Sequence, residues 1–271
     1  MIKHSGMSDH SQIIVVMPAF NAAKTLLRTW QELPHALLER VIVVDDASTD
    51  ETVAIASQLQ LQLFIHKRNR GYGANQKTCY KEALQAGATI VVMVHPDYQY
   101  DPRLLPALIL PIQQGRADVV LGSRFLGESP VAQGMPWWKF LGNRALTRLE
   151  NAVMGLSLSE LHTGYRAFRS EALQAVPFTL NSDHFLFDQE IIAQLVVGGF
   201  RIGEVAVPTR YMPEASSVGF WQSVRYGFSI LFMLLRVLAQ RHGLYSQRWL
   251  AVTPAAASTP AAQRESSKYN E

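Results

Sequence analysis

Short apolar runs rich in β-branched residues recur through the first half of this 271-residue chain, and they constrain its fold more than any other feature. The runs occupy residues 13–17, 40–44, 61–65, 89–94 and 118–122. Continuous apolar runs of this length are typical of strands buried on both faces, as in a parallel sheet. Segments of helical length separate them, at 23–33, 51–58, 74–86 and 104–114. The alternation predicts βαβ units and an α/β fold, with helices on both faces of a Rossmann-like sheet.

The pattern changes after residue 122, although it stays compatible with the same domain. A Pro/Gly loop at 127–136 precedes expected helices at 137–153 and 185–197 and a strand at 201–207. A long apolar helix is expected over 217–240. We therefore predict one domain over residues 12–250, with a first half at 12–125 and a second half at 126–250. Residues 1–11 are expected to be flexible, and the Ala/Ser/Thr/Pro-rich tail at 251–271 is expected to be disordered.

Composition excludes few classes of protein. The net charge of +3 is mild and gives no indication of a nucleic-acid partner. The single cysteine, Cys79, cannot form an intrachain disulfide, which agrees with a cytoplasmic location. We expect no signal peptide, because residues 1–12 are polar, and no membrane-spanning helix, because no apolar run reaches 18 residues.

Polar residues follow four of the predicted strands, and ligands of open α/β sheets bind at such carboxyl ends. The four endings read Pro18-Ala19-Phe20-Asn21, Asp45-Asp46-Ala47-Ser48-Thr49-Asp50, His95-Pro96-Asp97-Tyr98-Gln99 and Gly122-Ser123-Arg124. Asp45 and Asp46 are candidates to accept hydrogen bonds from a nucleobase or ribose. Asp50 is better explained as a cap of the following helix.

The segment Asn69-Arg70-Gly71-Tyr72-Gly73 is punctuated by glycine and opens a helix. It is not a dinucleotide-binding fingerprint, because Gln76 stands where a third glycine is needed. Arg70 and Gly71 could approach a phosphate or ribose. A simple turn at the start of a helix explains the glycines equally well.

The segment 95–99 places imidazole, carboxylate and amide groups at His95, Asp97 and Gln99. In an extended conformation these three side chains face the same way. Such a set suits Mn²⁺ or Mg²⁺, and the imidazole suits Mn²⁺ better. The alternative is a polar loop in which Asp97 caps a turn.

Charged residues recur in two later segments, Glu160-Leu161-His162-Thr163-Gly164-Tyr165-Arg166 and Phe187-Asp188-Gln189-Glu190. Asp188 and Glu190 are candidate general bases, with helix capping as the alternative for Asp188. Arg166 could equally lie on a solvated face.

Taken together, six of these segments, including Asp45-Asp46-x-Ser48-x-Asp50 and Thr163-Gly164-Tyr165-Arg166, occur in an order that resembles the family 2 glycosyltransferases of GT-A fold. The resemblance covers about residues 12–215 and is greatest to the dolichyl- or polyprenyl-phosphate sugar transferases. It implies an inverting transfer from a nucleotide-diphosphate sugar to a lipid phosphate. The implied donor-binding residues include Pro18, Ala19, Asn21 and Asp46. Asp97 would bind the cation with Gln99 beside it, and Arg124 and Arg166 would face the acceptor.

One residue departs from the family signature Asp-x-Asp, which reads His95-x-Asp97 here. A neutral imidazole can ligate a metal but adds no negative charge. The change could lower metal affinity, shift metal preference or abolish catalysis. Glu160 stands where the family has Asp, a milder change.

Three functions agree with these residues. They are a polyprenyl-phosphate glycosyltransferase, a glycosyltransferase for a saccharide or other hydroxyl acceptor with Asp188 or Glu190 as base, and a non-catalytic nucleotide-sugar binding protein. A lipid acceptor predicts peripheral attachment to the inner face of a membrane through the amphipathic helix at 217–240, because its aromatic and leucine side chains are flanked by Arg225 and Arg236. Arg124, Arg144, Arg148 and Arg166 would then line the approach of the lipid phosphate. The sugar, the base of the donor and the oligomeric state stay open.

Overall fold

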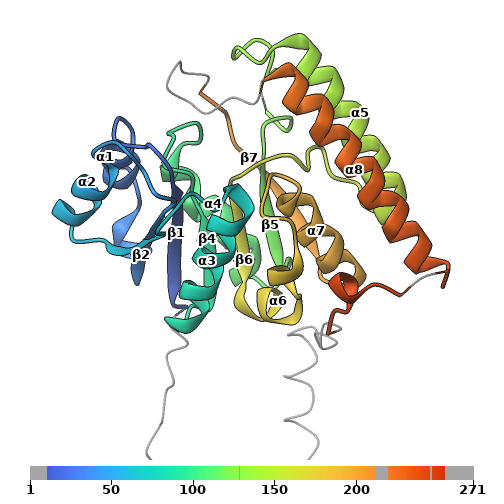
Figure 1. Ribbon diagram of the computed structural model, residues 1–271, viewed down its shortest axis with the longest axis horizontal. Helices are drawn as coiled ribbons and strands as arrows, with labels where there is room; N and C mark the ends of the chain where they lie inside the picture. Colours follow the sequence, from blue (N-terminus) through green and yellow to red (C-terminus); the bar gives the residue numbers. More distant parts are fainter. Residues whose placement is uncertain (1–10, 128, 211–218, 245, 254–271) are drawn as a thin grey trace, which may run out of the picture.

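The computed structural model describes residues 11–127, 129–210, 219–244 and 246–253 (Figure 1). These residues form one seven-stranded sheet with the order β3-β2-β1-β4-β6-β5-β7. The strands are β1 (Ile13–Ala19), β2 (Arg40–Asp45), β3 (Gln62–Ile65), β4 (Ile90–Met93), β5 (Val119–Ser123), β6 (Arg166–Arg169) and β7 (Ile202–Ala206). The α/β architecture predicted from the apolar runs is confirmed.

The sheet is mixed, which the expectation of a parallel sheet did not include. β1 pairs in parallel with β2 and β4, β2 with β3, and β5 with β7. β6 lies between β4 and β5 and is antiparallel to both. The strand-like run after residue 165 is thus inserted between two strands of the first half of the chain and is held to both by main-chain hydrogen bonds.

Every residue of the central strand β1 is buried, because helices cover both faces of the sheet. Ile14 and Val16 belong to one apolar cluster, whereas Val15 and Met17 belong to another on the opposite face. The alternation follows from the two-residue period of a strand. It explains why the sequence of β1 is apolar throughout.

The helices divide between the two faces. The first cluster includes residues of α3 (Tyr72–Gln85), α6 (Ser170–Ala175), α7 (Phe187–Val197) and α8 (Phe220–Arg241). The second includes residues of α1 (Leu26–Gln31), α2 (Thr52–Gln58) and α4 (Leu105–Gln113). Short 3₁₀ turns lie at His35–Leu37, Pro102–Leu104, Phe178–Leu180 and Arg248–Leu250.

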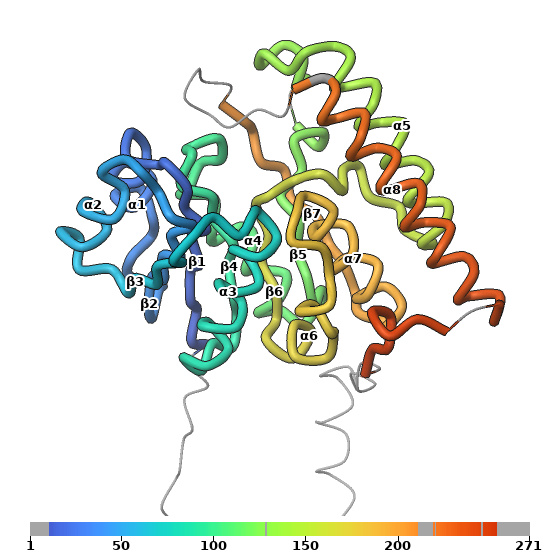
Figure 2. The backbone as a smooth tube through the Cα atoms, viewed as in Figure 1, coloured from blue at the N-terminus to red at the C-terminus, as the bar shows by residue number. Residues whose placement is uncertain are grey.

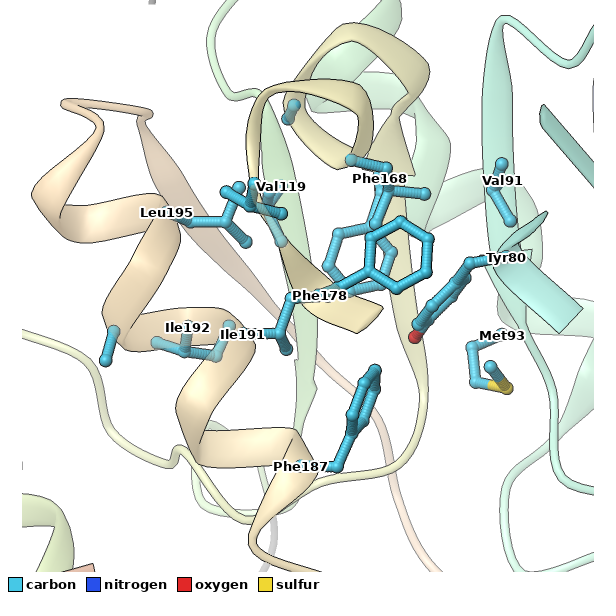
Figure 3. Packing of buried hydrophobic residues seen from close by; sticks show 14 of the residues in the cluster. Tyr80, Val91, Met93, Val119, Phe168, Phe178, Phe187, Ile191, Ile192 and Leu195 are labelled. Atoms are coloured by element: carbon cyan, nitrogen blue, oxygen red, sulfur yellow. The ribbon is translucent and has the colours of Figure 1, made fainter. Parts of the chain in front are cut away.

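Aromatic side chains fill the first cluster (Figure 3). The Tyr80 ring of α3 meets Phe168 and Phe178 edge-on, with ring centroids 5.3 and 5.9 Å apart, and Phe187 stacks near it at 6.1 Å. Edge-to-face contacts of this kind add to the stabilisation from burial. They fix α3 and α7 against the middle of the sheet.

Helix α8 lies beside α5 (Trp137–Met154) at one edge of the molecule (Figure 2). Arg241 at the end of α8 donates to the carbonyls of Val153 and Met154 at the end of α5. One side of α8 is buried through Ile230, Met233, Leu234 and Val237. In the part of the chain that the structure describes, α8 is also the helix that is long and apolar enough to cross a membrane, by length and composition alone.

The structure describes only part of the two chain ends that flank the predicted domain. Residues 1–10 and 254–271, where a flexible start and a disordered tail were expected, lie outside the described residues. The backbone N–H of Thr253 donates to the carbonyl of Ala175 at 3.0 Å, and Trp249 and Leu250 are buried. Residues around the predicted boundary at 250 are therefore packed on the domain, and Thr253 is hydrogen-bonded to it.

Candidate active site

A cavity of about 730 Å³ opens at the carboxyl ends of β1, β2 and β4. Its walls come from the loops after these strands, the start of α3, the segment before α7 and one side of α8. The sequence-predicted residues that line it are Pro18, Asn21, Asp46, Gly71, His95 and Asp97. The sheet thus brings together side chains that are up to 79 residues apart in the chain, as the strand-end argument predicted.

Asp46 lines the cavity and also fixes the loop that faces it. Its carboxylate accepts hydrogen bonds from the backbone N–H groups of Arg70 and Gly71 at 2.8 and 2.9 Å. The imidazole Nδ1 of His66 lies 2.7 Å from the same carboxylate. Asp46 can therefore hold the 69–71 loop in place beside a bound nucleoside.

Asp45 is placed differently, although it is the neighbour of Asp46. Its side chain is fully buried and accepts hydrogen bonds from the backbone N–H and hydroxyl of Ser48. It does not line the cavity, so the structure places Asp45 away from the wall where a base or ribose was expected to bind. The physical reason is local, because an aspartate three residues before a serine closes its own turn.

The loops after β1 and β2 are held to each other by side-chain hydrogen bonds. The Asn21 amide oxygen accepts from the backbone N–H of Thr49 at 2.9 Å. Asp50 accepts from the backbone N–H groups of Thr52 and Ala23, so it binds the first N–H of α2 from the position before the N-cap residue Glu51. Ala19 is buried, and its carbonyl accepts from the backbone N–H of Asp46. Ala19 thus shapes the site through its backbone.

The glycines at 71 and 73 serve a close approach of two backbone segments. Gly71 has a φ of +98°, and a Cβ there would lie 2.7 Å from the carbonyl oxygen of Asp183. The backbone N–H of Gly73 donates to that carbonyl at 2.8 Å. The Arg70 side chain is exposed and lies outside the cavity wall, where its expected contact with the donor would be made. Arg70 acts through its backbone N–H on Asp46.

A hydrogen-bonded chain of side chains runs from Tyr72 and His95 in the cavity wall to the buried Asp188. The Tyr72 hydroxyl donates to the Asp188 carboxylate at 2.7 Å and lies 3.3 Å from Nε2 of His95. Gln76 donates to the same carboxylate at 3.0 Å, and Arg166 lies 3.5 Å from it. Asp188 is therefore surrounded by donors.

This chain determines which nitrogen of His95 carries a proton. Burial and the nearby Asp188 raise the pKa of Tyr72 well above its usual value, so its single proton stays and points to Asp188. The Tyr72 oxygen can then only accept from Nε2–H of His95. The Nε2 edge of the ring also faces Gly164, where a Cβ would lie 2.8 Å from Nε2. The opposite nitrogen, Nδ1, keeps the lone pair.

His95 and Asp97 have the chemistry of a cation site, with Gln99 outside it. Tyr98 has a φ of +59°, so residues 95–99 turn instead of extending, and Gln99 does not line the cavity. The backbone N–H of Gln99 donates to the Asp97 carboxylate at 3.1 Å. Among the described residues, no cluster of three His, Cys, Asp or Glu side chains could hold a metal. A neutral imidazole and one carboxylate still suit Mn²⁺ or Mg²⁺ when a diphosphate and water supply the other oxygens.

The side chains of Arg124 and Arg166 were expected to face the acceptor, and the structure places neither in the cavity wall. Arg124 donates to Glu160 through its backbone N–H and Nε, both at 2.8 Å. Burial raises the pKa of Glu160, but Arg124 and Asn143 bring it below its usual value. Arg166 is 0% exposed and donates to the carbonyls of Leu161, Thr163 and Asp188. Both guanidiniums are occupied by partners within the protein.

Asp188 and Glu190, the candidate bases, also lie behind the cavity wall. Asp188 is held by Tyr72, Gln76 and Arg166, as described above. Glu190 is buried and accepts from the backbone N–H of Ser182, and burial raises its pKa. Both residues are buried, and neither lines the cavity in which an acceptor hydroxyl would be deprotonated.

A polar stripe on α8 forms the wall that sequence reasoning missed. It consists of Gln222, Arg225, Tyr226 and Ser229, spaced as one side of a helix. Among the described residues, the basic side chain that lines the cavity is that of Arg225. Its signal in the sequence was the interruption of an apolar segment by polar residues at intervals of three and four.

Comparison with known proteins places the chain in a family. The model of the family described as Glycosyl transferase family 2 matches residues 14–176. An uncharacterised protein of Methanocaldococcus jannaschii is 31% identical over 84% of this chain and 92% of its own length. A UDP-N-acetylglucosamine–dolichyl-phosphate N-acetylglucosaminyltransferase of Methanococcus voltae is 27% identical over 82% and 94%. A polyprenol monophosphomannose synthase of Mycolicibacterium smegmatis is 25% identical over 72% and 76%.

Solved structures agree on the fold. Glucosyl-3-phosphoglycerate synthase from Mycobacterium tuberculosis in complex with UDP has a TM-score of 0.62 at 18% identity, covering 88% of this chain and 82% of that one. The same enzyme with Mn²⁺, UDP and glucosyl-3-phosphoglycerate has a TM-score of 0.57 at 17% identity, with the same coverage. These likenesses support the GT-A fold.

Proposed function

We propose that this chain, which belongs to glycosyl transferase family 2, transfers a sugar from a nucleotide-diphosphate donor to a polyprenyl-phosphate acceptor at a membrane surface. Family membership makes sugar transfer the reaction class. The acceptor, the cation and the membrane attachment are additions to it, and different residues support each of them.

The observation that carries the proposal is the single cavity that joins Asp46, Asp97 and α8. Pro18, Asn21 and Gly71 surround the Asp46 end, where the nucleoside of the donor would lie. His95 and Asp97 follow β4, which is next to β1 in the sheet. The diphosphate would therefore lie over the end of β4, with the sugar directed toward α8.

Asp97 and Nδ1 of His95 would hold the divalent cation against the diphosphate. Burial lowers the pKa of His95, although Asp97 and Asp188 raise it, so the neutral ligand form prevails near pH 7. A cation bound there would stabilise the charge that develops on the leaving diphosphate. Tyr72 orients the imidazole for this position, as outer hydrogen bonds commonly do for metal-binding histidines.

The reaction follows from the acceptor's chemistry. An oxygen of the acceptor phosphate forms a bond to the anomeric carbon, and the bond from that carbon to the diphosphate breaks. The nucleoside diphosphate leaves with the electron pair, and a single displacement inverts the anomeric configuration. A phosphate monoester is already largely ionised near neutral pH, with a second pKa of about 6, and needs no base. The buried positions of Asp188 and Glu190 favour this acceptor over a hydroxyl.

Helix α8 supports attachment to a membrane. Trp221, Phe228, Phe232 and Leu235 are 80, 68, 64 and 63% exposed, although each is a large apolar side chain. The neighbouring helix α5 also exposes Trp137. Because the opposite side of α8 is packed on the domain, the helix would lie in the interface and not cross the bilayer. We place the enzyme peripherally on the cytoplasmic face.

A transfer assay tests the acceptor and the cation. Labelled UDP- and GDP-sugars are offered with a polyprenyl phosphate, a free saccharide or no acceptor, with Mn²⁺, with Mg²⁺ and with chelator. We expect a lipid-linked product that needs the cation and that Asp97→Ala abolishes, while the surface variant Glu39→Gln keeps wild-type turnover. Product on the saccharide alone would refute the lipid acceptor. Persistent activity of Asp97→Ala with chelator would refute the cation site.

Sedimentation with anionic liposomes tests the attachment. We expect the wild type to pellet at low salt and Phe228→Glu/Phe232→Glu to stay in the supernatant. The matched control is Leu27→Glu/Leu110→Glu, which adds two charges at exposed leucines of other helices. If the control loses binding equally, net charge and not the α8 surface is responsible.

A further inference from the structure

Arg225 occupies a distinctive position in the cavity wall. Within the described chain, Arg225 supplies the basic side chain of the cavity wall, while Asp46 and Asp97 supply carboxylates. No carboxylate of the described residues forms an ion pair with it. Arg124 and Arg166, by contrast, are each paired with an acid. Among the described residues, Arg225 is therefore the Lys or Arg of the cavity wall that remains available to an anion.

The backbone around Arg225 is held firmly. The neighbouring Tyr226 hydroxyl accepts a hydrogen bond from Gln189 at 3.0 Å and lies 3.3 Å from Nδ1 of His162. The Ser229 hydroxyl donates to the Arg225 carbonyl at 3.0 Å, within the same turn of α8. These contacts hold α8 in place around Arg225. The position of the Arg225 backbone beside the cavity is therefore defined.

Arg225 also lies at the boundary between two stripes of α8. At 3.6 residues per turn, Gln222, Tyr226 and Ser229 project to one side of it, toward the cavity. Trp221, Phe228 and Phe232 project to the other side, where they are exposed. A ligand with an anionic head and an apolar chain could therefore place its head at Arg225 and its chain along the exposed stripe.

The sheet order sets the position of this boundary relative to the donor. The nucleoside end of the cavity lies over β1 and β2, and His95 and Asp97 follow β4. α8 packs beyond this point, against α5 and α7. If the donor lies as proposed, Arg225 would meet the transferred sugar from the side away from the nucleoside, which is where an inverting reaction needs its acceptor.

We propose that Arg225 binds the phosphate monoester of the acceptor. The inference rests on the proposed function and names the acceptor's contact, which Arg124 and Arg166 do not provide. An arginine fork suits phosphate oxygens because it donates two parallel hydrogen bonds. The shared chemistry is a phosphate monoester, whether it belongs to an isoprenyl lipid or to a soluble phosphorylated acceptor.

Calorimetric titration tests the contact without depending on turnover. Geranyl phosphate, geraniol, 3-phosphoglycerate and inorganic phosphate are titrated into the protein with Mn²⁺ and UDP or GDP. We expect the wild type to bind geranyl phosphate more tightly than geraniol or the soluble phosphates. Arg225→Gln should weaken geranyl phosphate about tenfold to a hundredfold, as expected when a hydrogen-bonded charge is lost. Arg225→Lys should recover part of the affinity.

The control is Arg116→Gln, which removes the same charge from an exposed position before β5, outside the cavity. It should leave the affinity unchanged, and Arg225→Gln should leave nucleotide affinity unchanged. Equal weakening by both variants, or an unchanged affinity in Arg225→Gln, overturns the proposal. So does a wild type that binds no phosphate monoester.

The same variants distinguish this inference from the proposed function. If the wild type binds geranyl phosphate through Arg225 but transfers no sugar to it, the phosphate contact stands and the proposed reaction falls. If transfer occurs and Arg225→Gln leaves the KM for geranyl phosphate unchanged, the reaction stands and the contact falls. Tighter Arg225-dependent binding of 3-phosphoglycerate than of geranyl phosphate would assign the contact to a soluble acceptor.

Discussion

Replacing Gly164 with alanine should damage the site through a single methyl group. A Cβ at this position would lie 2.7 Å from Cδ2 and 2.8 Å from Nε2 of His95. Carbon atoms in ordinary contact are about 3.5 Å apart, so the imidazole would have to retreat by roughly 0.8 Å. The ring cannot retreat without cost, because it stacks on Tyr72 with the ring planes 3° apart and lies within hydrogen-bond distance of the Tyr72 hydroxyl. A misplacement of about 1 Å can cost 10²-fold in rate.

We therefore expect kcat/KM of Gly164→Ala to fall by roughly tenfold to a hundredfold, which corresponds to about 1.4–2.7 kcal/mol in the activation barrier. The assays are sugar transfer and Mn²⁺ binding followed by electron paramagnetic resonance. Gly127→Ala is the matched control, because a Cβ there meets nothing within 4 Å. Wild-type turnover and Mn²⁺ affinity in Gly164→Ala would refute the reasoning. A fall in Tm that accounts for the lost activity would do so as well.

Three further predictions concern Tyr72, His95 and Asp118. Tyr72→Phe should change the ¹⁵N shifts of the His95 ring from an Nε2–H tautomer to a mixture and lower turnover about tenfold, and an unchanged tautomer would contradict the proton assignment. His95→Asp should raise Mg²⁺-supported activity relative to Mn²⁺, so an unchanged ratio would count against His95 as a ligand. Burial raises the pKa of Asp118, but hydrogen bonds from Arg201 bring it below its usual 3.8. The pair's stabilisation is therefore present above about pH 4 and lost as the pH falls toward the lowered pKa. Asp118→Asn should cost about 1–2 kcal/mol in urea unfolding at pH 7 and lose this part of the pH dependence.

Much of the fold could be predicted from the sequence because its signals are local. The apolar run at 13–17 marked β1, since a strand covered on both faces needs apolar residues at every position. The antiparallel placement of β6 could not be predicted in this way. Its four residues between Arg166 and Arg169 carry no sign of direction, which depends on the path of the chain after β5.

The candidate site could be predicted from the sequence to about the same extent as the fold. Polar residues at strand ends pointed to Asp46, His95 and Asp97, and all three line the cavity. Gln99 was misplaced because the left-handed turn at Tyr98 redirects the chain. A tyrosine with positive φ gives no warning in the sequence, since this conformation is uncommon for residues other than glycine.

The sequence by itself determined the buried strands, the polar strand ends and the resemblance to family 2, because each depends on neighbouring residues or on the order of short motifs. The tertiary structure alone decided which charged groups form ion pairs with one another. Arg124 meets Glu160 and Arg166 meets Asp188 because chain folding brings together groups that lie 36 and 22 residues apart. It likewise placed Arg225 on a cavity whose other wall is formed by Asp46 and Asp97. Whether a charged side chain forms an ion pair with a group distant in the sequence or stays available to a ligand depends on how the helices pack. No local sequence pattern encodes that packing.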